Sequence, residues 1–306
     1  MIEVLAPGSL TTVQDAGRFG WRHVGVPVAG PADWLSHALA NRLVGNDDGA
    51  AALELTLTGP RLRFGAAATV AVLGATAALD GEPLPADASF RVPAGAELAV
   101  GPAGPGVRGY VAVAGGLAVP PVLGSRSTDT LAGLGPPPLA VGAILPASTV
   151  DCPLRTVRWA ALPAPRARAG EPLRVVPGPH EDWFTVEALH TLCSAAYVVT
   201  PASDRVGARL SGPGLARGRP GELPVTGMVA GALQVPPDGQ PILLLANHGP
   251  TGGYPIVGVL ATADLPAAGQ ARPGDPLRFA AVSRDAAARA DAELRAALAA
   301  AVIPVG

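Results

Sequence analysis

Four polar, glycine-rich segments stand out in a chain that is 49% apolar and only 15% charged. They cover residues 10–33, 112–128, 203–210 and 247–255. Each places hydrogen-bonding side chains beside glycine, whose missing Cβ lets backbone amides approach a ligand closely. Arginines in three of them could bind carboxylate or phosphate oxygens through the forked guanidinium. The alternative is that these segments are loop ends whose aspartates and arginines pair with each other.

Every basic side chain is an arginine, because none of the 22 Lys+Arg positions is lysine. This excludes a phosphate-binding loop of the GxxxxGK type, and it excludes pyridoxal-phosphate and other Schiff-base enzymes, which need a lysine amine. Biotin is carried on lysine, so we expect it, if used, to arrive on another chain. Nucleotide phosphates would have to be met by arginine, backbone N–H groups or Mg²⁺.

Other catalytic motifs are absent or fail. No HExxH or GxSxG motif occurs, and the five histidines are scattered, so we expect no metal site. Gly104, Gly106 and Gly109 fit the GxGxxG pattern. A predicted strand at 110–114 follows them, however, where a dinucleotide site needs a helix. We interpret these glycines as a turn.

Bulk properties narrow the class of protein. The net charge is −2 and no stretch concentrates arginine with aromatics, which makes a nucleic-acid surface improbable. Cys152 and Cys193 are too few for a disulfide framework. The first ten residues lack the basic region of a signal peptide, and the longest apolar run, 66–79, is shorter than a bilayer span of about 20 residues. A soluble cytoplasmic protein is the expectation.

The elements that must position these segments are mostly short strands separated by Gly and Pro. Residues 53–58 alternate Leu with Glu or Thr, the period of a half-buried strand. Pro31 suits the first position of a helix, and Ser283 is a candidate N-cap. Helices are expected over residues 31–45, about 181–194 and about 284–301.

The chain is predicted to be mainly β with a few helices, in two halves. The Pro-, Arg- and Ala-rich stretch 162–172 has little periodicity and is interpreted as a linker between residues 1–161 and 173–306. A short echo between Phe90–Gly95 and Leu233–Gly239 is weak support for duplication. Many short strands favour a β-barrel or sandwich in each half.

The polar segments also carry a resemblance that runs from about Ile2 to Phe279. The chain resembles the 5-oxoprolinase C-subunit family, also called the second subunit of allophanate hydrolase or the Kip-type kinase-inhibitor antagonist, which is related to the carboxyltransferase region of urea carboxylase. The motifs are Thr-Thr-Val-Gln-Asp-x-Gly-Arg (11–18), Gly-Val-Pro (25–27), Leu-Val-Gly-Asn (43–46), Leu-Glu-Leu-Thr-Leu-x-Gly-Pro (53–60), Val-Ala-Gly-Gly (113–116), Gly-Ser-Arg-Ser-Thr (124–128), Ser-Asp-Arg (203–205) and Thr-Gly-Gly-Tyr-Pro (251–255).

This resemblance implies two cyclophilin-like β-barrel subdomains, 1–161 and 173–306, the second with a C-terminal helix. It also implies a component of an ATP-dependent 5-oxoprolinase, a lactam hydrolase that opens 5-oxoproline to glutamate together with a B subunit (and an A subunit). Two alternatives stay open. One is a carboxyltransferase half-site that takes carboxybiotin from another chain, and the other is a non-catalytic partner of a kinase-inhibitor-like B subunit.

The resemblance also assigns roles to residues. Arg18 is expected to bind an anion that Asp15 orients, Asp204 to act as a general base or orient Mg²⁺·ATP, and Arg205 to hold a substrate carboxylate. The expected catalytic residues are Asp15, Asp204 and Arg205. The expected substrate- or ATP-binding residues are Gln14, Arg18, Arg126, Ser203, Asn247, His248, Thr251, Gly252, Gly253 and Tyr254.

The chain departs from the family pattern in two places. An Arg and an Asp that usually follow Gly-Ser-Arg-Ser-Thr are Pro136 and Ala143 here. The Asp-x-Gln-Thr that usually precedes Thr-Gly-Gly-Tyr is Asn247–Pro250 here. These changes bear on the identity of the substrate.

Overall fold

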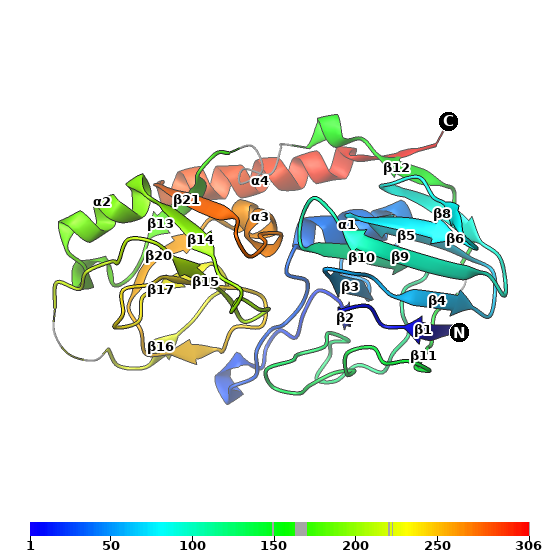
Figure 1. Ribbon diagram of the computed structural model, residues 1–306, viewed down its shortest axis with the longest axis horizontal. Coiled ribbons are helices and arrows are strands. Elements are labelled where there is room, and N and C mark those ends of the chain that lie inside the picture. Colours follow the sequence, from blue (N-terminus) through cyan, green and yellow to red (C-terminus); the bar gives the residue numbers. More distant parts are fainter. Residues whose placement is uncertain (149, 163–169, 220, 222, 306) are drawn as a thin grey trace. The chain divides into compact units, whose positions relative to one another are not determined.

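The computed structural model describes residues 1–148, 150–162, 170–219, 221 and 223–305. The chain divides into two compact units. Unit 1 comprises Met1–Phe19, Ala29–Leu162 and Ala297–Gly306, and unit 2 comprises Gly20–Val28 and Pro163–Ala296. Strands dominate both units (Figure 1), which confirms the prediction of a mainly β chain with a few helices.

Unit 1 contains two antiparallel sheets. The six-stranded sheet has the order β11 (Ile144–Leu145), β1 (Ile2–Ala6), β4 (Arg61–Phe64), β9 (Glu97–Ala103), β6 (Ala75–Leu79) and β7 (Glu82–Pro83). The seven-stranded sheet has the order β2 (Leu10–Gln14), β3 (Ala52–Thr56), β10 (Arg108–Val113), β5 (Ala68–Leu73), β8 (Ala88–Val92), β12 (Arg155–Val157) and β22 (Val302–Pro304). Apolar side chains of both sheets form one core.

The middle of the seven-stranded sheet is buried on both faces. All six residues of β5 and all six of β10 are buried. One face of these strands meets the shared core, and helix α1 (Trp34–Leu43) packs on them. Strands covered on both faces have continuous apolar runs, which is the pattern of 69–73 and 110–114 in the sequence.

Unit 2 contains a closed barrel. Its strands, in order around the barrel, are β13 (Leu173–Pro177), β20 (Ile256–Leu260), β17 (Ala232–Gln234), β18 (Ile242–Leu244), β15 (Gly207–Ser211), β14 (Ala196–Val199) and β21 (Pro276–Ala281). Because the barrel is closed, each of its strands pairs with a neighbour on both sides. Apolar side chains fill the interior and form a second core. A separate two-stranded ribbon joins β16 (Thr226–Gly227) to β19 (Thr251–Gly252).

Helices α1, α2 and α4 begin at side-chain caps. Asp33 caps α1 by accepting a hydrogen bond from Ser36 N at 2.9 Å, so Pro31 lies before the helix and not at its first position. The expected second helix is a 3-10 turn, Glu181–Trp183, followed by α2 (Val186–Ser194), which Thr185 caps. A short helix α3 covers Leu265–Gly269.

The third expected helix is α4 (Arg284–Ala300), and Ser283 Oγ accepts from Ala286 N as an N-cap does. The remaining 3-10 turns are η1 (Arg22–Val24), η2 (Trp159–Ala161) and η4 (Thr262–Asp264). No helix among the described residues is long and apolar enough to cross a bilayer. Gly104 and Gly106 of the GxGxxG pattern lie in the connection between β9 and β10, and Gly109 lies inside β10, where it pairs with Leu55; a strand follows the pattern, as predicted.

The boundaries of the units differ from the expected halves at both ends of the chain. Residues 297–306 group with unit 1, because β22 pairs with β12 and Arg42 Nη1 donates to Leu298 O at 3.0 Å. Gly20–Val28 groups with unit 2 although its flanking residues belong to unit 1. Of the expected linker 162–172, residues 163–169 lie outside the described residues.

Gly8→Ala tests the turn that joins the two sheets of unit 1 between β1 and β2. Gly8 has φ +73°, and a Cβ there would lie 2.3 Å from Thr58 O, a backbone atom that cannot rotate away. Gly81→Ala is the matched control, with φ +91° and no atom within 4 Å. Both variants carry a strain of about 1–3 kcal/mol, and the clash adds to it only at Gly8. We expect a clearly lower Tm for Gly8→Ala in thermal unfolding; equal Tm values for the two variants would contradict the steric argument.

Candidate functional site

The carboxylate of Asp15 is held by four donors within unit 1. Ser125 Oγ and Ser127 Oγ donate to Oδ1 at 2.6 and 2.7 Å, and Gly17 N donates to the same oxygen at 2.9 Å. Arg126 N donates to Oδ2 at 2.5 Å. The side chain is 8% exposed. We call these five residues the Asp15 clasp, and its geometry suits a structural anchor better than a catalytic group.

Arg18 is completely buried beside the clasp. Its Nε donates to Val122 O and its Nη2 to Ser127 O, both at 2.9 Å. Its Nη1 has no hydrogen-bond partner among the described residues. Two of its nitrogens therefore fix the backbone of residues 122–127 rather than pointing at a ligand.

The Nε of Arg126 is also held by a backbone carbonyl. That nitrogen donates to Val119 O at 2.8 Å, while the backbone N of the residue completes the clasp. The side chain is half-buried. The expected role of Arg126 in anion binding stays a prediction.

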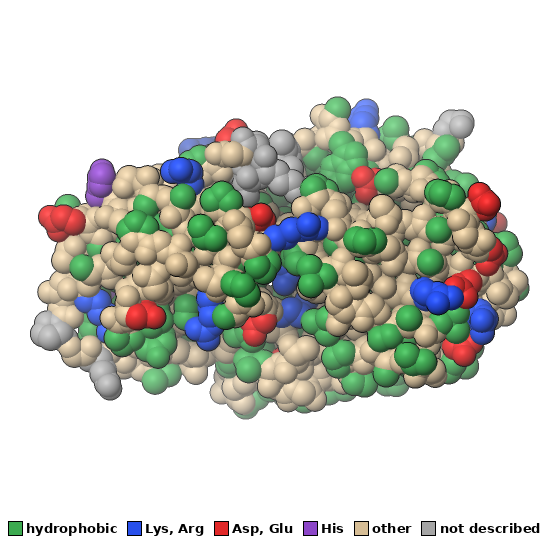
Figure 2. Space-filling view, in the orientation of Figure 1, with side chains coloured by type: hydrophobic (Ala, Val, Ile, Leu, Met, Phe, Trp, Pro, Cys, Tyr) green, Lys and Arg blue, Asp and Glu red, His purple; other side chains and the backbone are tan. Residues whose placement is uncertain are grey.

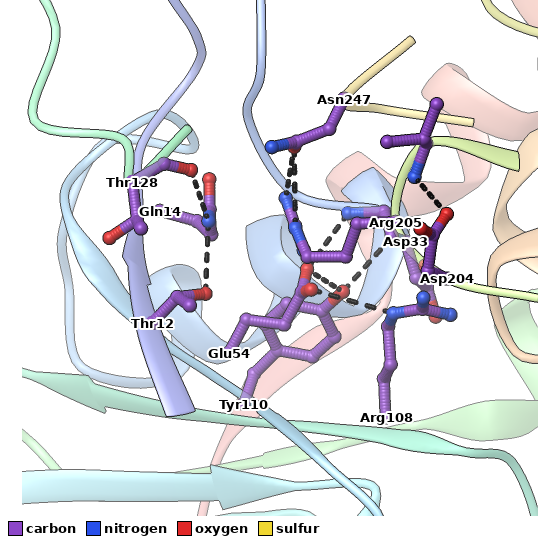
Figure 3. Close-up of polar contacts among 12 residues, drawn as sticks. Thr12, Gln14, Asp33, Glu54, Arg108, Tyr110, Thr128, Asp204, Arg205 and Asn247 are labelled. Atoms are coloured by element: carbon purple, nitrogen blue, oxygen red, sulfur yellow. Dashed lines mark hydrogen bonds and ion pairs between the residues drawn. The ribbon is translucent and has the colours of Figure 1, made fainter. Parts of the chain in front are cut away.

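Gln14 lies between Thr12 and Thr128 (Figure 3). Its Nε2 donates to Thr12 Oγ1 at 2.9 Å and to Thr128 O at 3.1 Å. Thr128 N also donates to Val13 O, and Leu139 N to Thr11 O. The long connection between β10 and β11 therefore covers the outer edge of β2. The first two polar segments meet along this edge.

Glu54 is a buried acid that sequence reasoning missed. The alternation of residues 53–58 suggested that it faces solvent, but Glu54 is 1% exposed. Its Oε2 accepts from Ala32 N at 2.8 Å and from Tyr110 OH at 2.9 Å, and its Oε1 lies 3.5 Å from Arg108 Nε. Tyr110 is the cross-strand partner of Glu54. The signal that could have found Glu54 is this pairing register of β3 and β10, because it places the Glu54 carboxylate opposite the Tyr110 hydroxyl.

Tyr110 and His37 extend this polar cluster. Tyr110 OH accepts from Asp33 N at 2.9 Å, and burial raises the pKa of the phenol well above its usual value. His37 meets the Tyr110 ring edge-on at 5.9 Å. Since a carbonyl can only accept, His37 Nε2 donates to Gln14 O at 3.0 Å and carries the proton. Burial lowers the pKa of His37, so the ring is neutral at neutral pH.

Unit 2 contributes the pair Arg205 and Asn247. Arg205 is 4% exposed, and its Nε and Nη2 donate to Asn247 Oδ1 at 3.3 and 3.1 Å (Figure 3). Asn247 N donates back to Arg205 O at 2.9 Å. Burial lowers the pKa of Arg205 to about 10, which still leaves it charged at neutral pH. The third and fourth polar segments are brought together by this pair.

His248 follows Asn247 and is 4% exposed. Its Nδ1 donates to Gly249 O at 2.7 Å. Burial is the main cause that lowers the pKa of His248, and the charge of Arg22 lowers it further. The ring is therefore neutral at neutral pH.

The other expected residues of unit 2 lie in turns. Asp204 Oδ1 accepts from Val206 N and Gly207 N at 2.8 and 3.1 Å, a local Asx turn that leaves Oδ2 at an exposed position. Ser203 Oγ accepts from Arg209 N at 3.0 Å. These bonds are local to the segment 203–210, and the expected roles of both residues stay predictions.

Thr251 and Gly252 form β19 and pair with β16, a strand from a distant part of the chain, and the expected binding roles of residues 251–254 stay predictions. A Cβ on Gly252 would lie 2.6 Å from Gln234 Nε2 and 3.1 Å from Met228 Cε, so a larger residue here would displace these two side chains. Gly253 is exposed, and Tyr254 is 44% exposed. Among the described residues, no three His, Cys, Asp or Glu side chains are grouped to hold a metal ion.

The surface carries few charges. Figure 2 shows scattered charged side chains among apolar and uncharged ones on the face drawn, in keeping with the 15% charged composition. Several residues with charged side chains are instead buried, namely Asp15, Arg18, Asp33, Glu54, Arg108, Asp129, Arg205 and Asp264. Buried charges are rare in proteins, and functional sites are one place where they concentrate.

Comparison with known proteins identifies relatives over nearly the whole chain. The family model described as carboxyltransferase domain, subdomain A and B, matches residues 24–281. The chain is 34% identical to the C subunit of 5-oxoprolinase from Escherichia coli, covering 95% of this chain and 94% of that protein. It is 34% identical to the urea amidolyase of Saccharomyces cerevisiae, covering 92% of this chain but only 17% of that longer protein.

Solved structures agree with these relatives. The urea amidolyase of K. lactis superposes with a TM-score of 0.90 at 30% identity, over 97% of this chain and 20% of that one. The protein TTHA0988 superposes with a TM-score of 0.82 at 41% identity, over 91% of this chain and 55% of that one. This chain therefore spans only part of several of its relatives.

Asp15→Asn tests the structural role of the clasp. In the variant, the NH₂ group of asparagine faces hydrogen-bond donors that bind a carboxylate in the wild type. Each hydrogen bond to a charged group contributes about 1.5–3 kcal/mol. We expect urea unfolding to show a loss of about 2–3 kcal/mol. Asp47→Asn, at an exposed position, is the control. An unchanged free energy of unfolding for Asp15→Asn would refute the anchor.

His37→Gln tests the burial of the neutral imidazole. Because the pKa of His37 is lowered in the folded protein from 6.5, the unfolded chain binds the proton first as pH falls. The stability of the wild type is therefore lost progressively below pH 6.5, by up to about 1.4 kcal/mol per pH unit for this group. We expect His37→Gln to show a shallower decline between pH 6.5 and 5 in urea unfolding, and the exposed His190→Gln to keep the wild-type slope. Identical slopes for all three proteins would show that His37 is not the source.

Proposed function

Since this chain belongs to the carboxyltransferase domain family with subdomains A and B, we propose that it acts as the C subunit of an ATP-dependent 5-oxoprolinase. In this role it would open the lactam of 5-oxoproline to glutamate together with the B and A subunits. The observation that carries the proposal is reciprocal coverage. The chain matches 94% of the E. coli C subunit, but only 17% of the yeast urea amidolyase.

Opening a lactam requires water to add to the carbonyl carbon and the C–N bond to break, with a proton taken up by the departing nitrogen. Negative charge develops on the carbonyl oxygen as water adds, so donors aimed at that oxygen lower the barrier. The product carries one carboxylate more than the substrate. Arginine and backbone N–H donors can serve this need without a nucleophilic serine.

We assign substrate binding to Arg205. Its guanidinium is buried, charged at neutral pH, and held in one orientation by Asn247 Oδ1 at 3.1 and 3.3 Å. A fixed guanidinium is suited to the carboxylate that 5-oxoproline already carries. Asp204 keeps Oδ2 outside its turn, so we retain it as the candidate general base. Asp15 is reassigned to the clasp.

ATP belongs to the assembled subunits in this proposal, and we place no nucleotide contact on this chain. The proposal needs no biotin. Because the chain has no lysine, biotin would have to be carried on a partner if the runner-up function holds. That runner-up is a carboxyltransferase half-site, favoured by the TM-score of 0.90 with the K. lactis urea amidolyase.

The test is ATP turnover that depends on 5-oxoproline, measured with the chain and its partner subunits. Loss of one charge-assisted pair of about 1.5–3 kcal/mol corresponds to about a 10- to 150-fold fall in kcat/KM. We expect this fall for Arg205→Ala, with partial activity for Arg205→Lys because lysine offers a point charge without the fork. Arg209→Ala, at an exposed position in the same segment, should keep wild-type activity.

Two results would contradict the proposal at different levels. Assembled subunits with no 5-oxoproline-dependent turnover would reject the function. Full activity of Arg205→Ala would reject only the assignment of the substrate carboxylate to this arginine. Carboxyl transfer from a carboxybiotin carrier in the same preparation would favour the runner-up.

A further inference from the structure

His248 has a fixed tautomer. The Gly249 carbonyl can only accept, so the 2.7 Å contact requires the proton on Nδ1. In a neutral ring the other nitrogen, Nε2, then carries a lone pair and can only accept. The backbone is also held, because His248 N donates to Leu245 O at 3.2 Å. The ring is thus presented in one orientation with an acceptor at its far end.

The acceptor of His248 has no partner within the described part of the chain. The hydrogen bond to Gly249 uses Nδ1 alone. Nε2 is not fully enclosed by protein atoms, although the residue as a whole is only 4% exposed. An acceptor that is mostly desolvated and unpaired leaves a place for a donor from a ligand.

A positive charge acts on His248. The charge of Arg22, also in unit 2, opposes protonation of the ring. Arg205 is joined to the preceding residue, Asn247, by two hydrogen bonds. Cationic neighbours attract an anionic ligand, while the neutral lone pair of Nε2 needs an N–H or O–H donor. A secondary amide with a nearby carboxylate has both features.

We propose that His248 Nε2 accepts a hydrogen bond from the amide N–H of the substrate and thereby restricts this site to amides or lactams with an unsubstituted N–H. The inference rests on the proposed function, whose substrate carries an N–H beside a carboxylate. His248 is a specificity-determining residue in this view. An N-alkylated analogue would leave the acceptor unpaired, and sites built around a hydrogen bond discriminate strongly against ligands that lack the partner.

The first test compares binding of 5-oxoproline and N-methyl-5-oxoproline to the full chain by calorimetry. An unpaired acceptor costs about 1–3 kcal/mol, so we expect the wild type to prefer 5-oxoproline by about 5- to 150-fold. His248→Asn keeps a donor for Gly249 O and lacks the far acceptor, so its preference should fall to about onefold. His248→Gln places an amide oxygen near the Nε2 position and should retain a preference. The exposed His190→Asn is the control.

A second readout follows the nitrogen itself. In protein labelled with ¹⁵N-histidine, the Nε2 resonance of His248 should move toward the protonated range when 5-oxoproline is added, because the lone pair then accepts a hydrogen bond. N-methyl-5-oxoproline should leave it in place. A role limited to loop structure would not produce this ligand-dependent difference.

The outcomes separate this inference from the function on which it rests. If the assembled subunits turn over 5-oxoproline but His248→Asn keeps the wild-type preference, the inference is overturned and the function stands. If turnover is absent, urea against tetramethylurea tests the same acceptor for the runner-up, and a preference for urea that His248→Asn loses supports the inference. A chain that distinguishes neither pair overturns it.

Discussion

The burial of ionised side chains in a chain with few charges is the constraint on which the rest of the structure depends. A buried charge is tolerated only where hydrogen bonds replace the lost water. Asp15 obtains four such bonds, and Glu54 obtains two together with an ion pair to Arg108. Each of these sets draws on segments far apart in sequence. The buried charges therefore hold the loops in place, just as the loops supply the hydrogen bonds that stabilise the charges.

The chemistry of the partners separates structural charges from candidate functional ones. Asp15 and Arg205 are both buried and both belong to polar motifs. Asp15 accepts hydrogen bonds from serine and backbone donors, and Arg205 donates to the amide oxygen of Asn247, which orients its guanidinium. A guanidinium oriented in this way is suited to anion recognition. His248 has its proposed role for a similar reason. Its Nδ1 is fixed by a backbone carbonyl, and its Nε2 is left as an acceptor.

The departure at residues 247–250 gains a physical meaning from this arrangement. Asn247 lies at one of the expected departures from the family pattern, and its Oδ1 accepts two hydrogen bonds that orient Arg205. The neighbouring histidine then adds an acceptor without adding negative charge. Together these changes favour an anionic substrate that also offers an N–H group, which is consistent with the proposed lactam.

The amino-acid sequence by itself determined the mainly β class, the positions of the helices around 34–43 and 284–300, the strand after the GxGxxG pattern and the family, because these follow from local periodicity, capping and ordered motifs. It could not show that Glu54 is buried, since a period of two identifies one face of a strand but not whether the other face is also covered. Nor could it separate Asp15 from Arg205. Only the tertiary structure showed which groups bind each charge, because Ser125 and Ser127 lie 110 and 112 residues from Asp15, and Asn247 lies 42 residues from Arg205, along the chain.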